Sequence, residues 1–179
     1  MIILISGGAK NGKSDFAQEL AVKLSKGRHY YVATMIPADG EDHARIRRHL
    51  KSREGMGFET IECGRNILSC LDYADRKASF LLDSTTSLLL NEIYPNHKTW
   101  KPEKCAPERV AREVAEFCRR VENVVVVSDA IYSDAQRYDP ETELYRRGLA
   151  LIDRTVVKIA DTVIEASAGQ FIIHKGGPL

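Results

Sequence analysis

The chain has 179 residues, of which 44% are hydrophobic and 28% charged, and its formal net charge is +1. This composition is typical of a globular protein with a single domain over 1–179, and the balanced charge gives no basic field for nucleic acid or an anionic membrane. We expect a cytoplasmic protein, because the sequence has no bilayer-spanning apolar run, no signal peptide and no C-x-x-C pair among its four cysteines.

The first predicted element is a short apolar strand at 2–5 that leads directly into a glycine-rich loop. Residues 7–14 read GGAKNGKS, the pattern G-x-x-x-x-G-K-[ST], and a helix is expected over 14–26. In this pattern backbone amides point at phosphate oxygens, the lysine contacts the β- and γ-phosphates, and the serine hydroxyl binds Mg²⁺. We therefore expect a nucleoside triphosphate on a loop made of Gly7, Gly8, Ala9, Lys10, Asn11, Gly12, Lys13 and Ser14.

The second cluster of candidate residues is a histidine between arginines in the helix expected over 41–52. Arg45, His49 and Arg53 follow one another at intervals of four residues and therefore share a helix face. Neighbouring cations keep an imidazole neutral and nucleophilic near pH 7, and guanidinium groups hold phosphates. The pattern fits a histidine that attacks phosphorus and is transiently nucleotidylated. On spacing alone, a solvated basic face with an incidental histidine is favoured.

Apolar strands and helical stretches alternate along the rest of the chain. Further strands are expected at 30–34, 79–82 and 124–128, and further helices at 65–75, 107–122 and 141–160. Apolar runs at 162–166 and 170–174 flank a predicted turn and indicate an antiparallel hairpin. The predicted fold is α/β, a three-layer P-loop NTPase fold with a mostly parallel sheet and an antiparallel C-terminal edge.

Ligands bind at the carboxyl ends of the strands in this kind of fold. The loops predicted at 95–106 and 129–140 are therefore expected to border the site. Asp83 follows the strand predicted at 79–82, beside the phosphate loop, and is placed to hold the Mg²⁺ ion that Ser14 also binds.

Several motifs in the first half of the chain occur in a specific order. They are MIILISGGAKNGKS at 1–14, YVAT at 31–34, ARIRRH at 44–49 with Arg53, TIE at 60–62, and LLD at 81–83 followed by STT at 84–86. In order and spacing they resemble the bifunctional adenosylcobinamide kinase / adenosylcobinamide-phosphate guanylyltransferase family. The second half departs from that family, because Ser128-Asp129-Ala130 stands where the family usually has Asn-Glu-Val-Gly.

The resemblance implies two steps of cobalamin biosynthesis, with GTP and ATP as substrates. Family members phosphorylate the aminopropanol hydroxyl of adenosylcobinamide, a corrinoid acceptor, and then transfer GMP from GTP to that phosphate through a guanylylated histidine. Carried onto this sequence, His49 is the nucleophile, Lys13 assists it, Arg45 and Arg53 position phosphates, and Asp83 lies near Mg²⁺. The implied lining of the nucleotide site beyond the loop is Ala33, Thr34, Leu50, Lys51, Ser52, Arg53, Glu62 and Asp83. A homo-oligomer, such as a trimer, is also implied.

Two other functions fit the same residues. A P-loop kinase of another small molecule would need Lys13 and Asp83 but would be indifferent to His49. A non-catalytic regulatory module would bind a triphosphate without turning it over. A covalent label from GTP that depends on His49 distinguishes the predicted enzyme from both alternatives.

Overall fold

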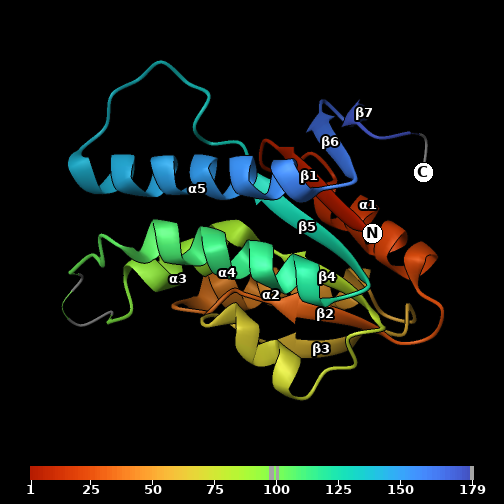
Figure 1. The fold of residues 1–179 in the computed structure, drawn as a ribbon. Helices are drawn as coiled ribbons and strands as arrows, with labels where there is room; N and C mark the ends of the chain where they lie inside the picture. The colour runs from red at the N-terminus through yellow and green to blue at the C-terminus, as the bar shows by residue number, and fades with distance from the viewer. Residues whose placement is uncertain (97–98, 100, 178–179) are drawn as a thin grey trace.

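The computed structural model describes residues 1–96, 99 and 101–177, and its strands form one sheet. Its strands are β1 (Ile2–Gly7), β2 (His29–Ala33), β3 (Glu59–Glu62), β4 (Ser79–Asp83), β5 (Asn123–Asp129), β6 (Thr162–Ser167) and β7 (Gln170–Lys175). Within the described residues the sheet order is β3-β2-β4-β5-β1-β6-β7, and every neighbouring pair is parallel except the β6–β7 hairpin (Figure 1). This arrangement confirms the predicted mostly parallel sheet with an antiparallel C-terminal edge.

Helices cover both faces of the sheet. Within the described residues, the α-helices are α1 (Lys13–Leu24), α2 (Gly40–Ser52), α3 (Thr85–Ile93), α4 (Ala106–Arg120) and α5 (Pro140–Ile159), and there is a short 3₁₀ helix, η1 (Ile67–Asp72). Helix α1 packs on one face, whereas α3, α4, α5 and η1 pack on the other. In the described part of the chain, no helix has both the length and the apolarity needed to cross a membrane.

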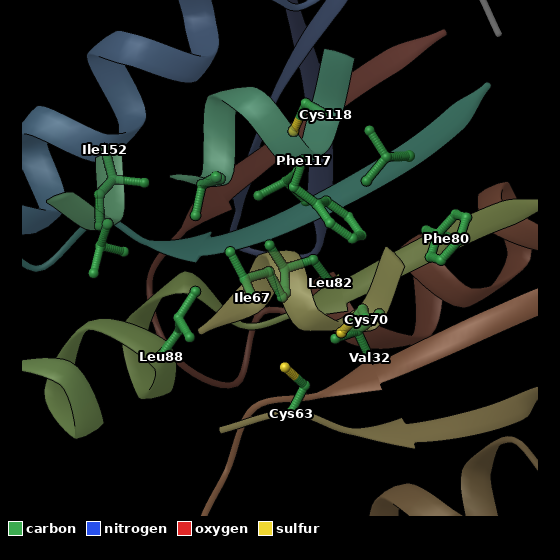
Figure 2. Packing of buried hydrophobic residues seen from close by; sticks show 14 of the residues in the cluster. Val32, Cys63, Ile67, Cys70, Phe80, Leu82, Leu88, Phe117, Cys118 and Ile152 are labelled. Atoms are coloured by element: carbon green, nitrogen blue, oxygen red, sulfur yellow. The ribbon is translucent and has the colours of Figure 1, made fainter. Parts of the chain in front are cut away.

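The central strands bury side chains on both faces, because successive residues of a strand point to opposite sides. On β4, Phe80 and Leu82 belong to the core beneath α4 and η1, while Leu81 belongs to the core beneath α1. Figure 2 shows Phe80 and Phe117 of α4 within the first core, and their rings meet edge to face with centroids 5.4 Å apart. Burial on both sides holds the carboxyl ends of the central strands in a defined register.

Three elements differ from the sequence-based predictions. The sequence does not predict β3, an edge strand in which only Ile61 is buried and which therefore has no apolar run. It does not predict α3, whose buried Asn91 and Glu92 bond to groups far along the chain, among them the Thr34 carbonyl and the Asn66 amide. The helix predicted at 65–75 is wrong in type and length, because the structure has the 3₁₀ helix η1 there.

Candidate nucleotide-binding site

The phosphate loop connects the carboxyl end of β1 to the first turn of α1. A Cβ atom on Gly7 would lie 2.2 Å from the carbonyl oxygen of Ala166, so only glycine lets β1 approach β6 this closely. Gly12 precedes α1 with a φ of 77°, in the left-handed region that glycine adopts without strain. Asn11 donates a hydrogen bond of 3.2 Å to the Ala166 carbonyl and ties the loop to β6. The loop is therefore anchored to its neighbouring strand.

Lys13, the lysine of the motif, is buried and forms an ion pair with Asp129. Its Nζ atom lies 2.9 Å from Asp129 Oδ1 and also donates to the Gly8 carbonyl. Asp129 ends β5, and the parallel register pairs it with Gly7 at the start of the loop. In the sequence, Asp129 stands where the family usually has a glutamate, but its contact with Lys13 was not predicted. The available signal was its position directly after a buried apolar strand, the same signal that singled out Asp83.

Asp83 ends β4, and its orientation is fixed by Tyr31 of the adjacent strand β2. The Tyr31 hydroxyl donates to Asp83 Oδ2 at 2.9 Å. Burial, followed by the charge of Asp83, raises the pKa of Tyr31, so this hydroxyl stays a donor. Strand β5 lies between β4 and β1 in the sheet and separates Asp83 from the phosphate loop.

Ser14 and Asp83 each carry oxygens of the kind that Mg²⁺ prefers, although β5 lies between strands β4 and β1 that precede them. Protein Mg²⁺ sites that act on nucleotides commonly use one or two protein oxygens and complete their coordination with phosphates and water. The half-buried Ser14 hydroxyl in the first turn of α1 and the carboxylate of Asp83 supply such oxygens. The described residues contain no cluster of three or more His, Cys, Asp or Glu side chains able to hold a metal alone. Phosphate oxygens would therefore have to complete the site.

A cavity of about 270 Å³ lies between α2 and the carboxyl ends of β2, β3 and β4. It brings together many of the residues that the sequence singled out. Those that line it are Ala33, Arg45, His49, Leu50, Arg53, Glu62 and Asp83. None of the phosphate-loop residues lines this cavity, so His49 and Lys13 occupy separate parts of the same sheet edge. We call this space the His49 cavity.

Arg53 forms a wall of the His49 cavity and is held by three contacts. Its guanidinium donates to the His49 carbonyl at 3.2 Å and to Thr60 Oγ1 at 3.1 Å. The same group lies over the Tyr31 ring, 3.9 Å from its centroid. Arg53 is buried, whereas Arg45 is exposed on α2. The two predicted phosphate-positioning arginines therefore differ in how strongly the fold holds them.

Three predicted lining residues lie outside the His49 cavity. Thr34 is fully buried and exchanges hydrogen bonds of 2.8 Å with the backbone of Ser84, so it supports the site from behind. Lys51 and Ser52 are exposed at the end of α2. Helix α2 itself buries no side chain, and its apolar residue Leu50 is exposed. Its capping residue Asp39 accepts hydrogen bonds from the first backbone amides of the helix.

The two predicted long loops have different positions. The segment after β5 starts at the site with Asp129 and then arches over α5 (Figure 1). Its far part bounds a cavity of about 930 Å³ against α5, where Arg146 forms ion pairs with Asp134 and Glu143. The loop predicted at 95–106 joins α3 to α4, and its residues 97, 98 and 100 lie outside the described residues.

Comparison with known structures agrees with the class that the sheet order and loop define, the P-loop NTPase fold. The chain superposes on the ATPase domain of G40P with a TM-score of 0.56 and 13% identity, covering 99% of this chain and 78% of that one. It superposes on a protein of Pyrococcus horikoshii OT3 with a TM-score of 0.53 and 10% identity, covering 99% and 87%. At such identities the likeness concerns the fold alone.

The sequence comparisons define the family. The profile of the cobinamide kinase / cobinamide phosphate guanyltransferase family matches residues 3–173, and the chain belongs to this family. The bifunctional adenosylcobalamin biosynthesis protein CobU of Salmonella typhimurium is 34% identical over 96 residues. That match covers 52% of this chain and 51% of the relative, so the chain spans about half the length of the curated relative it matches.

Proposed function

We propose that the protein phosphorylates adenosylcobinamide and then transfers GMP from GTP to the resulting phosphate. Family membership supports the two reactions, and one structural observation carries the assignment of residues. The phosphate loop and the His49 cavity lie at the carboxyl edge of one sheet, with Asp83 in the cavity wall and Asp129 at Lys13. A triphosphate extending along this edge would reach both the lysine and the histidine.

In the proposed guanylyl transfer, the guanine occupies the His49 cavity, where the Glu62 carboxylate can accept its N–H groups. The imidazole of His49 attacks the α-phosphorus of GTP. A P–N bond forms, the bond between the α-phosphorus and the bridging oxygen breaks, and pyrophosphate leaves. A phosphate oxygen of the acceptor then attacks the same phosphorus, the P–N bond breaks, and His49 is regenerated. Arg45 and Arg53 hold phosphate oxygens during both displacements.

In the proposed kinase step, the phosphate loop holds a triphosphate with its γ-phosphate at Lys13. The acceptor hydroxyl oxygen attacks the γ-phosphorus, the β–γ bridging bond breaks, and a nucleoside diphosphate leaves. The hydroxyl proton passes to Asp129, whose carboxylate is released from Lys13 once phosphate binds the lysine. Bound Mg²⁺, held by Ser14 and Asp83, would supply neutralisation of the charge on the phosphates.

The guanylyl transfer is tested by incubating the protein with GTP labelled at the α-phosphorus and with Mg²⁺. We expect a covalent label that is acid-labile and base-stable, as a phosphoramidate should be. His49→Ala should abolish the label, whereas His43→Ala, which removes the other histidine of the same cavity, should retain it. A wild-type protein that takes up no label would refute the histidine mechanism. A label lost only in His43→Ala would indicate that His43, not His49, is the nucleophile.

The kinase step is tested separately by following nucleoside diphosphate release with ATP or GTP. We expect release that depends on adenosylcobinamide and on Lys13 but not on His49. Release that depends on a different small molecule would support the alternative P-loop kinase. Binding without any turnover of either labelled nucleotide would support the regulatory module. The single domain over 1–179, the trimer and the cytoplasmic location stay predictions.

A further inference from the structure

A groove lies on the flank of the phosphate loop that faces away from the His49 cavity. This groove, of about 410 Å³, lies between the start of α1 and the β6–β7 hairpin. Lys10, Gly12, Asp15, Phe16 and Glu19 line one side, and Phe171 of the hairpin lines the other. We call it the hairpin groove. The proposed guanylyl transfer uses the phosphate loop, but it uses no side chain of this groove that belongs to α1 or to the hairpin.

Two aromatic rings in the hairpin groove form a stacking surface beside the loop. Phe16 and Phe171 are parallel within 22°, with ring centroids 3.9 Å apart, and both are only half-buried. A Cβ atom placed on Gly12 would lie 4.0 Å from Phe171 Cζ, so a side chain at this loop position would be in van der Waals contact with the ring. Exposed aromatic rings next to a phosphate cradle provide a surface on which a nucleobase can stack.

The two carboxylates of the hairpin groove, opposite in charge to Lys10 on the loop, favour the base end of a nucleotide over its phosphate end. Asp15 and Glu19 lie one turn apart on α1, and both are exposed in the groove. For the part of the chain that the structure describes, neither carboxylate has an ion-pair or hydrogen-bond partner. Like charges at this spacing destabilise a helix slightly, and carboxylates repel phosphate but accept N–H groups from a base. The groove therefore suits a purine whose phosphates continue onto the loop.

The loop and the hairpin are joined in a way that would hold base and phosphates in a defined geometry. Asn11 donates to the Ala166 carbonyl, and Gly7 packs against the same backbone. The hairpin turn at Ala168 and Gly169 has two consecutive positive φ values, of 49° and 76°, which bring β7 back beside α1. Both halves of the hairpin groove are thus anchored to one rigid corner of the sheet.

We propose that the hairpin groove binds the base of the purine nucleoside triphosphate that donates its γ-phosphate, an inference that rests on the proposed kinase step. The sheet order puts β6 and β7 on one side of β1 and puts β5, β4 and β2 on the other. A triphosphate whose base lies in the hairpin groove directs its γ-phosphate toward Asp129 and Asp83. A GTP whose base lies in the His49 cavity instead keeps its α-phosphate on that side. One phosphate loop therefore serves the two reactions with triphosphates in opposite orientations.

The first test is photocrosslinking of the wild-type protein with 8-azido-ATP and with 8-azido-GTP, followed by peptide mapping. We expect 8-azido-ATP to label peptides of α1 or the β6–β7 hairpin, and 8-azido-GTP to label these peptides and also those of α2 and β3. Labelling of α2 and β3 alone by both probes would overturn the proposal. Because the readout is binding, it is independent of whether His49 becomes guanylylated or an acceptor is phosphorylated.

The second test compares Phe171→Ala with Ile172→Ala, a control on the opposite face of the same strand. We expect Phe171→Ala to lower the affinity for a non-hydrolysable ATP analogue about 5- to 100-fold, the usual effect of losing one base–aromatic stack. The affinity should fall much more than the rate of histidine labelling from GTP, and Ile172→Ala should alter neither. Equal affinities in the two variants would contradict the proposal, and a failure of labelling in wild type would refute only the guanylyl transfer.

Discussion

The ion pair between Lys13 and Asp129 must open before a phosphate group can bind the lysine. Its atoms are 2.9 Å apart, and at an effective dielectric constant of about 20 the attraction between two such charges is about 6 kcal/mol. Desolvation of both groups offsets most of this value, and Asp129 keeps 20% of its side-chain surface exposed. We therefore assign the pair a net contribution of about 1–3 kcal/mol in the free protein.

Asp129→Asn should lower stability and raise nucleotide affinity. Both effects should reflect the net free energy of the Lys13–Asp129 ion pair. The substitution leaves the buried Lys13 without its counter-charge in the free protein, whereas in the complex phosphate restores it. We expect the free energy of unfolding to fall by about 1–3 kcal/mol, and the affinity for a triphosphate to rise about 5- to 150-fold. Phosphoryl transfer should slow at the same time, because the proposed proton acceptor is lost.

The assay is calorimetric titration with a non-hydrolysable triphosphate in EDTA, together with urea denaturation of the free protein. EDTA chelates Mg²⁺, so that a contact between Asp129 and the metal does not contribute to the measured affinity. The control is Glu122→Gln, which breaks an exposed pair with Lys26 just before β5 and should change stability by about 0.5 kcal/mol or less. A variant that is destabilised yet binds the triphosphate no more tightly would refute the competition between carboxylate and phosphate for Lys13.

Three further predictions concern positions whose surroundings the structure defines. Gly7→Ala would place a Cβ atom 2.2 Å from a backbone oxygen, so we expect a loss of about 1–3 kcal/mol in thermal unfolding and weaker triphosphate binding; unchanged binding would contradict it. Arg53→Lys cannot reproduce the forked contacts or the stack on Tyr31, so we expect histidine labelling from GTP to slow at least tenfold, with Arg47→Lys on the exposed face of α2 as the unaffected control. Burial raises the pKa of Asp153 above 3.8, so the folded state retains this proton longer than the unfolded state, and stability should fall as pH rises above about 4. Asp153→Asn should remove that part of the slope in urea denaturation measured across pH, and a slope equal to that of wild type would contradict the assignment.

Much of the fold was predictable because its signals are local. The apolar runs of β1, β4 and β5 have buried residues on both faces, and each ends at a polar residue. The hairpin of β6 and β7 was visible from its turn residues. Strand β3 was not visible, because an edge strand with one buried side chain carries no apolar pattern. Helix α3 was not visible either, because distant backbone groups satisfy its buried polar side chains.

The candidate site was predictable where one motif contains all of its parts. The phosphate loop is such a motif, because its glycines, lysine and serine act within a single turn of chain. Helix spacing singled out His49 and Arg53, the strand-end position singled out Asp83, and the family motifs added Glu62. The structure gathers these four residues in one cavity. The burial and the contacts of those residues were not predictable. The exposure of α2 and the burial of Arg53 against Tyr31 depend on contacts between elements.

The sequence by itself determined that a phosphate loop follows the first strand, because backbone curvature and charge there depend only on consecutive residues. Only the tertiary structure decided what surrounds that loop. Strand pairing sets Asp129 beside Gly7 on one side and Ala166 beside it on the other, although these residues are more than a hundred positions away in the chain. Parallel sheets place such partners together because each strand ends at the same edge. The Lys13–Asp129 pair and the hairpin groove both arise from this convergence.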